Sequence, residues 1–243
     1  MIFFIGLPLV AKDKTREYYL LFASSNMDYE NQKIASFSYR HSLFAATIGL
    51  ESTNNRWKSI YEFQYVGGKL KHFFTENEFN PQSILKYDRF VFEEKWFYRL
   101  TPEKRSFKFY LGSGFFQQFR LDKVHGGAGS FVLNHSYGLF RHTMDLFCVK
   151  RFDNLELRFR NALGLWYITN ESEWNAYHDW NNQHTVRFFG VSNLYYSQDI
   201  SLKWTLSSHF SIPIGIRFEF NSPRNKMDEK IVMKQLYIGC RFK

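Results

Sequence analysis

The stretch "HFSIPIGIRFEF" (residues 209–220) places an apolar side chain at every second position. Successive side chains of a strand point to opposite faces, so this stretch predicts a strand with one continuous apolar face. A protein core and a lipid bilayer would both accept that face. Its members are Phe210, Ile212, Ile214, Ile216, Phe218 and Phe220, and the opposite face carries Ser211, Pro213, Gly215, Arg217 and Glu219.

The composition suits a strand barrel in a membrane. At 243 residues the chain has the length of a single all-β domain. Its mean hydropathy is only −0.40, yet 20% of its residues are aromatic. A transmembrane barrel shows this mixture because only alternate residues need be apolar. A helical membrane protein is excluded, since no segment reaches the ~18 continuous apolar residues that a membrane helix needs.

Alternating apolar segments recur along the chain and predict about ten strands, within a range of eight to twelve. The connections between them alternate between short and long, as in a transmembrane antiparallel up-and-down barrel with tight periplasmic turns and extended outer loops. Eleven residues tilted by ~45° span ~25 Å of the membrane normal, which is the height of the apolar band of such barrels. The predicted strands are 16–25, 33–51, 56–66, 86–100, 105–120, 130–150, 154–168, 185–206, 209–221 and 230–243.

Aromatic residues with a polar edge recur near the predicted strand ends. In a bilayer such residues form girdles at the two interfaces, although each one alone could equally be a packing residue. The predicted girdle residues are Trp57, Tyr61, Trp96, Tyr98, Trp166, Tyr167, Trp204 and Tyr237.

The volume of a barrel indicates that the apolar face points outward. A soluble ligand-binding barrel would turn that face inward, but a barrel of eight strands has an interior just wide enough for side chains or one small ligand. Ten strands with several Phe, Leu or Ile residues each would overfill this space. The opposite face carries small and charged residues and suits a polar lumen. Pro213 lies within a strand and predicts a local bulge or a water-bridged lumen site.

The end of the chain resembles a known family. "QLYIGCRFK" alternates Leu236, Ile238, Cys240 and Phe242 with polar or small residues and ends almost on an aromatic. It resembles the closing strand of bacterial outer-membrane β-barrel proteins, and "IPIGIRFEF" is similar to penultimate strands of barrels from Bacteroidetes-type bacteria. Lys243 follows the aromatic where the family pattern usually stops. The resemblance names no subfamily. It implies the cell outer membrane of a Gram-negative bacterium, recognition by the barrel-assembly machinery, and contact with outer-membrane lipids and lipopolysaccharide.

The chain divides into a start segment and one domain. Residues 1–11 have the length of a signal-peptide core but lack preceding basic residues, so they are interpreted as a truncated export signal. A buried first strand is the alternative. Residues 12–243 form the predicted barrel domain, with mobile outward loops at 67–85 and 169–184.

No arrangement of residues predicts an enzyme or a metal site with useful specificity. Cys148 and Cys240 are the only cysteines, and no Cys/His spacing resembles a zinc site. We therefore expect no metal and no cofactor. "LNHSYG" resembles the His-x-Ser motif of outer-membrane phospholipases and lipid A deacylases, but adjacent residues such as His135 and Ser136 point to opposite faces of a strand. His142 with Asp145 and His178 with Asp179 resemble the acid–base pairs of outer-membrane proteases, but sequences rich in His, Asp and Asn produce such neighbours by chance.

Charge is the best sequence guide to function. The net charge of +9 favours anionic partners, but the basic residues are scattered along strands, so no nucleic acid is expected. We predict a small channel or surface-binding barrel, with a lumen that plugs itself by ion pairs or favours small anionic solutes. The alternatives are a lipid-modifying enzyme or protease of the outer membrane and, less favoured, a soluble ligand-binding barrel. The candidate lumen residues are Arg158, Arg160, Arg187, Lys203, Arg217, Glu219 and Arg241.

Overall fold

Strands make up nearly all of the part of the chain that the computed structural model describes, which is residues 15–31, 37–73, 84–125, 132–175, 185–189, 195–222 and 229–243. None of these residues lies in a helix long and apolar enough to cross a membrane. The strands are β1 (Thr15–Asn31), β2 (Phe37–Asn54), β3 (Trp57–Phe73), β4 (Ile84–Arg99), β5 (Phe107–His125), β6 (Val132–Phe152), β7 (Leu155–Asn175), β8 (Thr185–Phe189), β9 (Tyr195–Thr205), β10 (Phe210–Asn221) and β11 (Glu229–Phe242).

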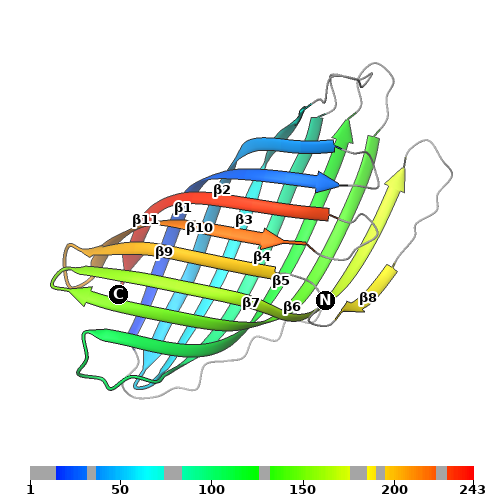
Figure 1. Ribbon diagram of the computed structural model, residues 1–243. Coiled ribbons are helices and arrows are strands. Elements are labelled where there is room, and N and C mark those ends of the chain that lie inside the picture. The colour runs from blue at the N-terminus through cyan, green and yellow to red at the C-terminus, as the bar shows by residue number, and fades with distance from the viewer. Residues whose placement is uncertain are drawn as a thin grey trace.

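The sheet closes on itself into a transmembrane antiparallel barrel (Figure 1). β1 pairs with β2 on one side and with β11 on the other, and β6 pairs with β7. β8 and β9 pair with successive parts of β7, so the two together occupy one strand position in the barrel. The ring therefore has ten strand positions, which we call places. The predicted fold is confirmed, with one correction: the segment predicted as a single strand over 185–206 is two strands.

The tight turns and the C-terminus share one end of the barrel, at the left of Figure 1. We call it the turn end and the opposite end the loop end. Asn55 and Asp153 each open a two-residue turn with a left-handed backbone (φ 49° and 45°), a conformation that Asn and Asp tolerate. The predicted loops at 67–85 and 169–184 are in part wrong, because β3 continues to Phe73, β4 begins at Ile84 and β7 continues to Asn175. The rest of both segments lies outside the described residues.

The apolar side chains of alternate positions point outward, as the sequence predicts. Every second residue of β10 from Ser211 to Asn221 is buried inside, while Ile214 and Ile216 are 48% and 58% exposed. At the turn end, aromatic rings of neighbouring strands contact each other. The ring centroids of Trp57 and Tyr98 are 5.1 Å apart, and those of Phe210 and Phe242 are 5.4 Å apart. These rings form the girdle at this end of the barrel.

A bulge decides which aromatic residues of β7 face the membrane. His142 pairs with Trp166 whereas Thr143 pairs with Gly164, so Leu165 is an extra residue in β7. Trp166 therefore faces outward and Tyr167 faces the lumen, where it is 2% exposed. Tyr167 was predicted in the girdle together with Tyr237, which is also inside; for both, the prediction is wrong.

No such shift occurs at Pro213. The pairing of β10 with β11 passes from Ser211–Arg241 to Ile214–Ile238 without a change of register, and Pro213 pairs with Lys203 of β9. The bulge predicted at this position is therefore absent from the described ladder.

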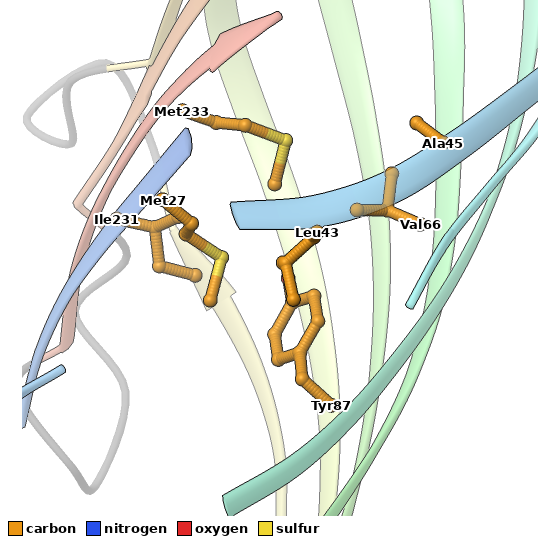
Figure 2. Packing of buried hydrophobic residues seen from close by; sticks show 7 residues of the cluster. All are labelled: Met27, Leu43, Ala45, Val66, Tyr87, Ile231 and Met233. Carbon is orange, nitrogen blue, oxygen red and sulfur yellow. The ribbon is translucent and has the colours of Figure 1, made fainter. Parts of the chain in front are cut away.

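The lumen is not uniformly polar. Figure 2 shows seven buried hydrophobic residues from β1, β2, β3, β4 and β11 that point toward one another inside the barrel. Two further buried clusters centre on Phe116 with Tyr195 and on Phe97 with Phe147. The sequence predicts a lumen of small and charged residues, and these buried hydrophobic and aromatic clusters correct that prediction.

Two tyrosines lie flat over glycines inside the turn end. Tyr237 pairs with Gly215 and Tyr19 pairs with Gly49, each across one strand boundary. A Cβ atom at Gly215 would lie 2.5 Å from the Tyr237 ring, so only glycine leaves room for it. The hydroxyl of Tyr237 donates to Asp199 (2.7 Å) and that of Tyr19 donates to Glu62 (2.9 Å). The glycines thus let both rings reach the charged centre of the lumen.

The outward face predicts a depth-dependent penalty for charge. Ile216 lies near the middle of β10 and Phe210 at its turn end. In a bilayer, Ile216→Arg should lower the free energy of unfolding by ~2–4 kcal/mol, whereas Phe210→Arg should cost ~0–1 kcal/mol because the interface hydrates the guanidinium. Denaturant titration of protein refolded into phospholipid vesicles measures both. Equal effects at the two depths would show that lipid does not surround this face.

Candidate functional site

The predicted lumen residues do face the lumen wherever their side chains are described. Arg158 and Arg160 lie on β7, Lys203 on β9, Arg217 and Glu219 on β10, and Arg241 on β11, and each is at most 9% exposed. Arg187 lies in β8, and its side chain is outside the described part. Alternation along each strand places these residues inside, because their outward neighbours are apolar.

Glu62 of β3 and Asp199 of β9 form one charged centre. Glu62 accepts hydrogen bonds from Arg160 (3.0 Å) and Arg217 (3.3 Å). Asp199 accepts from Arg217 as well (3.0 Å) and lies 3.6 Å from Arg160. The two guanidinium groups are therefore held between two carboxylates that come from different walls of the barrel.

Glu51 of β2 forms a second centre nearer the turn end. It pairs with Arg158 (2.7 Å) and with Arg241 (2.8 Å). β2 and β7 are five places apart in a ring of ten, so the Glu51–Arg158 pair joins opposite walls. Glu17 of β1 joins this centre through Lys203 (2.9 Å) and Arg241 (3.3 Å).

A third bridge crosses the barrel closer to the loop end. Arg89 of β4 donates to both carboxylate oxygens of Glu219, at 2.6 and 3.0 Å, and these strands also lie on opposite walls. Such a two-pronged pair is the strongest geometry for an arginine and a carboxylate. Nearby, Arg141 donates to Asn221 (2.8 Å) and its guanidinium lies 4.0 Å above the ring of Tyr195. Together these contacts cross the lumen closer to the loop end.

The carboxylate partners were missed by the sequence analysis, except for Glu219. Period-2 alternation places these acids inside as well, so the signal that finds the basic residues would also have found them. The two centres hold nearly balanced charge among the described residues, with cations Lys58, Arg158, Arg160, Lys203, Arg217 and Arg241 and anions Glu17, Glu51, Glu62, Glu156 and Asp199.

Little free space remains between the two centres. The cavity there measures about 30 Å³ and is lined by Tyr19, Glu62, Arg160 and Arg217 among others. A space of this size holds about one or two water molecules. Between the two centres the described side chains thus leave a cavity of only this size.

A second set of polar side chains faces the membrane. The Ser113 hydroxyl of β5 lies 2.7 Å from Nε2 of His142 on β6, and both side chains point outward. Asp145 points inward and binds Lys95 and Thr143, so His142 and Asp145 lie on opposite faces and form no pair. His178 and Asp179 lie outside the described residues. Sequence alone could not join Ser113 to His142, because they are far apart and meet only through the β5–β6 register.

No protein-family model and no curated protein sequence matches the chain. Among solved structures, the translocator domain of the autotransporter NalP from Neisseria meningitidis aligns with a TM-score of 0.56 and 8% identity, covering 94% of this chain and 88% of that one. The transport unit of the autotransporter AIDA-I from Escherichia coli aligns with a TM-score of 0.45 and 9% identity, covering 98% and 93%. Neisserial surface protein A aligns with a TM-score of 0.38 and 10% identity, covering 93% and 96%. The likeness to the NalP domain supports the fold alone: this chain has the architecture of a bacterial outer-membrane β-barrel.

We expect the charged centre around Glu62 to contribute more to the free energy of unfolding than an exposed ion pair does. Glu62→Gln leaves Arg160 and Arg217 with less compensating charge inside the barrel, so we expect the free energy of unfolding to fall by ~3–5 kcal/mol. Glu103→Gln is the matched control. The Glu103 side chain is 72% exposed, and its carboxylate makes a single long ion pair of 3.8 Å with Arg99. It should change stability by less than ~1 kcal/mol. Denaturant titration in detergent micelles measures both, and an equal effect of the two substitutions would contradict the role given to Glu62.

Proposed function

We propose that this protein is an outer-membrane barrel with a closed lumen that works as a surface-binding protein and not as an open channel. The observation that carries this proposal is that ion pairs cross the lumen between opposite walls, at Glu51–Arg158 and at Arg89–Glu219. Among the basic residues predicted to attract anionic solutes, those with described side chains are engaged by carboxylates, namely Arg158, Arg160, Lys203, Arg217 and Arg241.

The free energy needed to separate the buried ion pairs argues against ion flow along this lumen. A hydrated ion needs a continuous water path, whereas the cavity between the charged centres measures about 30 Å³. Opening it would separate buried pairs, and removing one partner of such a pair typically costs ~3–5 kcal/mol. Of the two roles predicted from the sequence, surface binding is therefore favoured over the channel.

The strands supply a surface beyond the membrane. β6 and β7 have 21 residues each. At ~3.3 Å per residue and a tilt of ~45° they rise ~49 Å, about twice the ~25 Å apolar band. The outward residues near the loop end are polar, among them Lys86, Asp88 and Asn170. This end is the proposed binding surface.

The cellular location is part of the proposal. The fold, the outward apolar band and the closing strand 235–243 support an outer-membrane barrel with its turn end in the periplasm. Origin in a Bacteroidetes-type bacterium rests on residues 212–220 alone and stays a prediction. The alternative of a lipid-modifying enzyme has the Ser113–His142 contact in its favour. Within the described residues no carboxylate bonds to His142 to orient it, so this alternative is the weaker one.

Planar-bilayer recording tests the closed lumen. The wild-type protein should give no stepwise current, because the ion pairs leave no continuous water path. The double variant Glu51→Gln/Glu62→Gln leaves Arg158 and Arg160 without their full partners and should leak with a preference for anions. Glu103→Gln should stay silent. A steady wild-type conductance would overturn the closed lumen and restore the channel.

Labelling of intact cells tests the location and the orientation. In a background with Cys148 and Cys240 replaced by alanine, Lys86→Cys places a thiol on the outer face near the loop end, and Arg56→Cys places one in a turn. A membrane-impermeant maleimide should label the first in intact cells and the second only after the outer membrane is opened. The reverse pattern would show that the turn end faces outward.

A further inference from the structure

Two lysines stand opposite each other on the outer surface of the barrel. Lys69 of β3 pairs with Lys86 of β4, and both are exposed. Tyr87, the residue after Lys86, is buried inside, so alternation turns Lys86 outward. Lys123 of β5 is the register partner of Lys86 on its other side. One row of the sheet thus places three lysines on neighbouring strands, although like charges at opposed positions destabilise a sheet.

The lysine pair lies at the height where the apolar band ends. Lys69 is twelve residues from Trp57 along β3, and Lys86 is twelve residues from Tyr98 along β4. Trp57 and Tyr98 are paired girdle rings of the turn end. Twelve residues at ~3.3 Å each and a tilt of ~45° rise ~28 Å, whereas the apolar band is ~25 Å high. The two lysines are therefore level with the headgroups of the leaflet at the loop end.

Contacts on the same face hold Lys86 in position. Its Nζ atom lies 3.2 Å from Oδ2 of Asp88, and the hydroxyl of Tyr65 donates to Oδ1 of Asp88 at 2.7 Å. Gly67 makes this second contact possible, because a Cβ atom there would overlap the Tyr65 hydroxyl. The Lys86 side chain is nonetheless 52% exposed. Its ammonium group is thus oriented by Asp88 and still open to a further partner.

Asp88 balances only one of the two opposed charges. Within the described part of the chain, Asp88 pairs with Lys86 and no carboxylate forms an ion pair with Lys69. A phosphate monoester carries about −1.5 to −2 charges at pH 7 and has three acceptor oxygens. Each lysine ammonium offers three donors, so one such phosphate can accept hydrogen bonds from both. A phosphate diester carries less charge and fits this pair less well.

Aromatic rings lie on the turn-end side of the lysines. Phe90 is the second outward residue after Lys86 on β4, and the centroid of its ring lies 5.2 Å from that of Tyr65. Phe63 of β3 is 46% exposed, and its ring centroid lies 6.4 Å from that of Phe90. A ligand that contacts both the lysines and these rings needs an anionic head and an apolar tail. A lipid has both, whereas a soluble anion has only the first.

We propose that Lys69 and Lys86 form a binding site for a membrane lipid whose headgroup carries a phosphate monoester. The phosphate accepts hydrogen bonds from both ammonium groups, and the acyl chains of the lipid cover Phe63 and Phe90. The assignment to the outer leaflet rests on the proposed function, which places the turn end in the periplasm. Failure to bind such a lipid would leave the closed lumen and the orientation untouched, because bilayer recording and cell labelling test those separately.

Native mass spectrometry of the full-length protein released from detergent micelles tests the site. The probes are dioleoyl phosphatidic acid, a phosphate monoester, and dioleoyl phosphatidylglycerol, a diester with the same chains. The wild type should retain phosphatidic acid about fivefold better, as expected when the headgroup beside the lysines gains charge. Lys69→Gln/Lys86→Gln should remove this preference. Lys69→Arg/Lys86→Arg should keep it, because both positive charges remain.

A matched control removes the same charge elsewhere. Lys104 lies in the connection between β4 and β5 and Lys234 lies on β11, and both are exposed. Lys104→Gln/Lys234→Gln should keep the preference, and all variants should migrate as folded barrels in a cold gel. Equal retention of the two lipids by the wild type would overturn the proposal, as would an equal loss of preference in the control. Displacement of phosphatidic acid by excess inorganic phosphate would assign the lysines to soluble anions and would equally overturn it.

Discussion

The carboxylate of Glu51 meets the guanidinium of Arg158 from the opposite wall of the barrel, and the interior depends on contacts of this kind. A strand barrel must place something inside, and here the inward positions carry full charges. Buried charges are tolerated only when they are paired and hydrogen-bonded. Glu62, held by Arg160, Arg217 and Tyr19, shows how far this pairing goes, since one carboxylate serves four strands including its own.

The same pairing explains why aromatic residues share the lumen. Glycines at 49 and 215 leave room for the rings of Tyr19 and Tyr237, whose hydroxyls then reach the acidic groups. Farther toward the loop end, guanidinium groups lie over rings, as Arg141 does over Tyr195. A planar cation over a ring face gains attraction without needing a second carboxylate. Charge pairs thus occupy the lumen at both levels, and arginines over aromatic rings add to them toward the loop end.

The proposed closure of the lumen moves the functional question to the outer surfaces. The loop end extends beyond the apolar band, and the membrane-facing surface carries Glu94 and the Ser113–His142 pair among aromatic rings. Lipid is the solvent of that surface, so polar groups there cost more than they would in water. The protein nonetheless carries them on that surface.

The alternation of side chains, a local property of each strand, determined the all-β barrel, the apolar band of β10 and β11, and the inward position of Arg158 or Arg217. The sequence could not assign partners, because Glu51 and Arg158 meet only when strands far apart in the chain reach opposite walls of one ring. It also could not place the bulge at Leu165, which reverses the faces of Trp166 and Tyr167. Register and closure are global properties: each pairing is fixed by the sum of many cross-strand contacts, and one extra residue reverses every side chain that follows it.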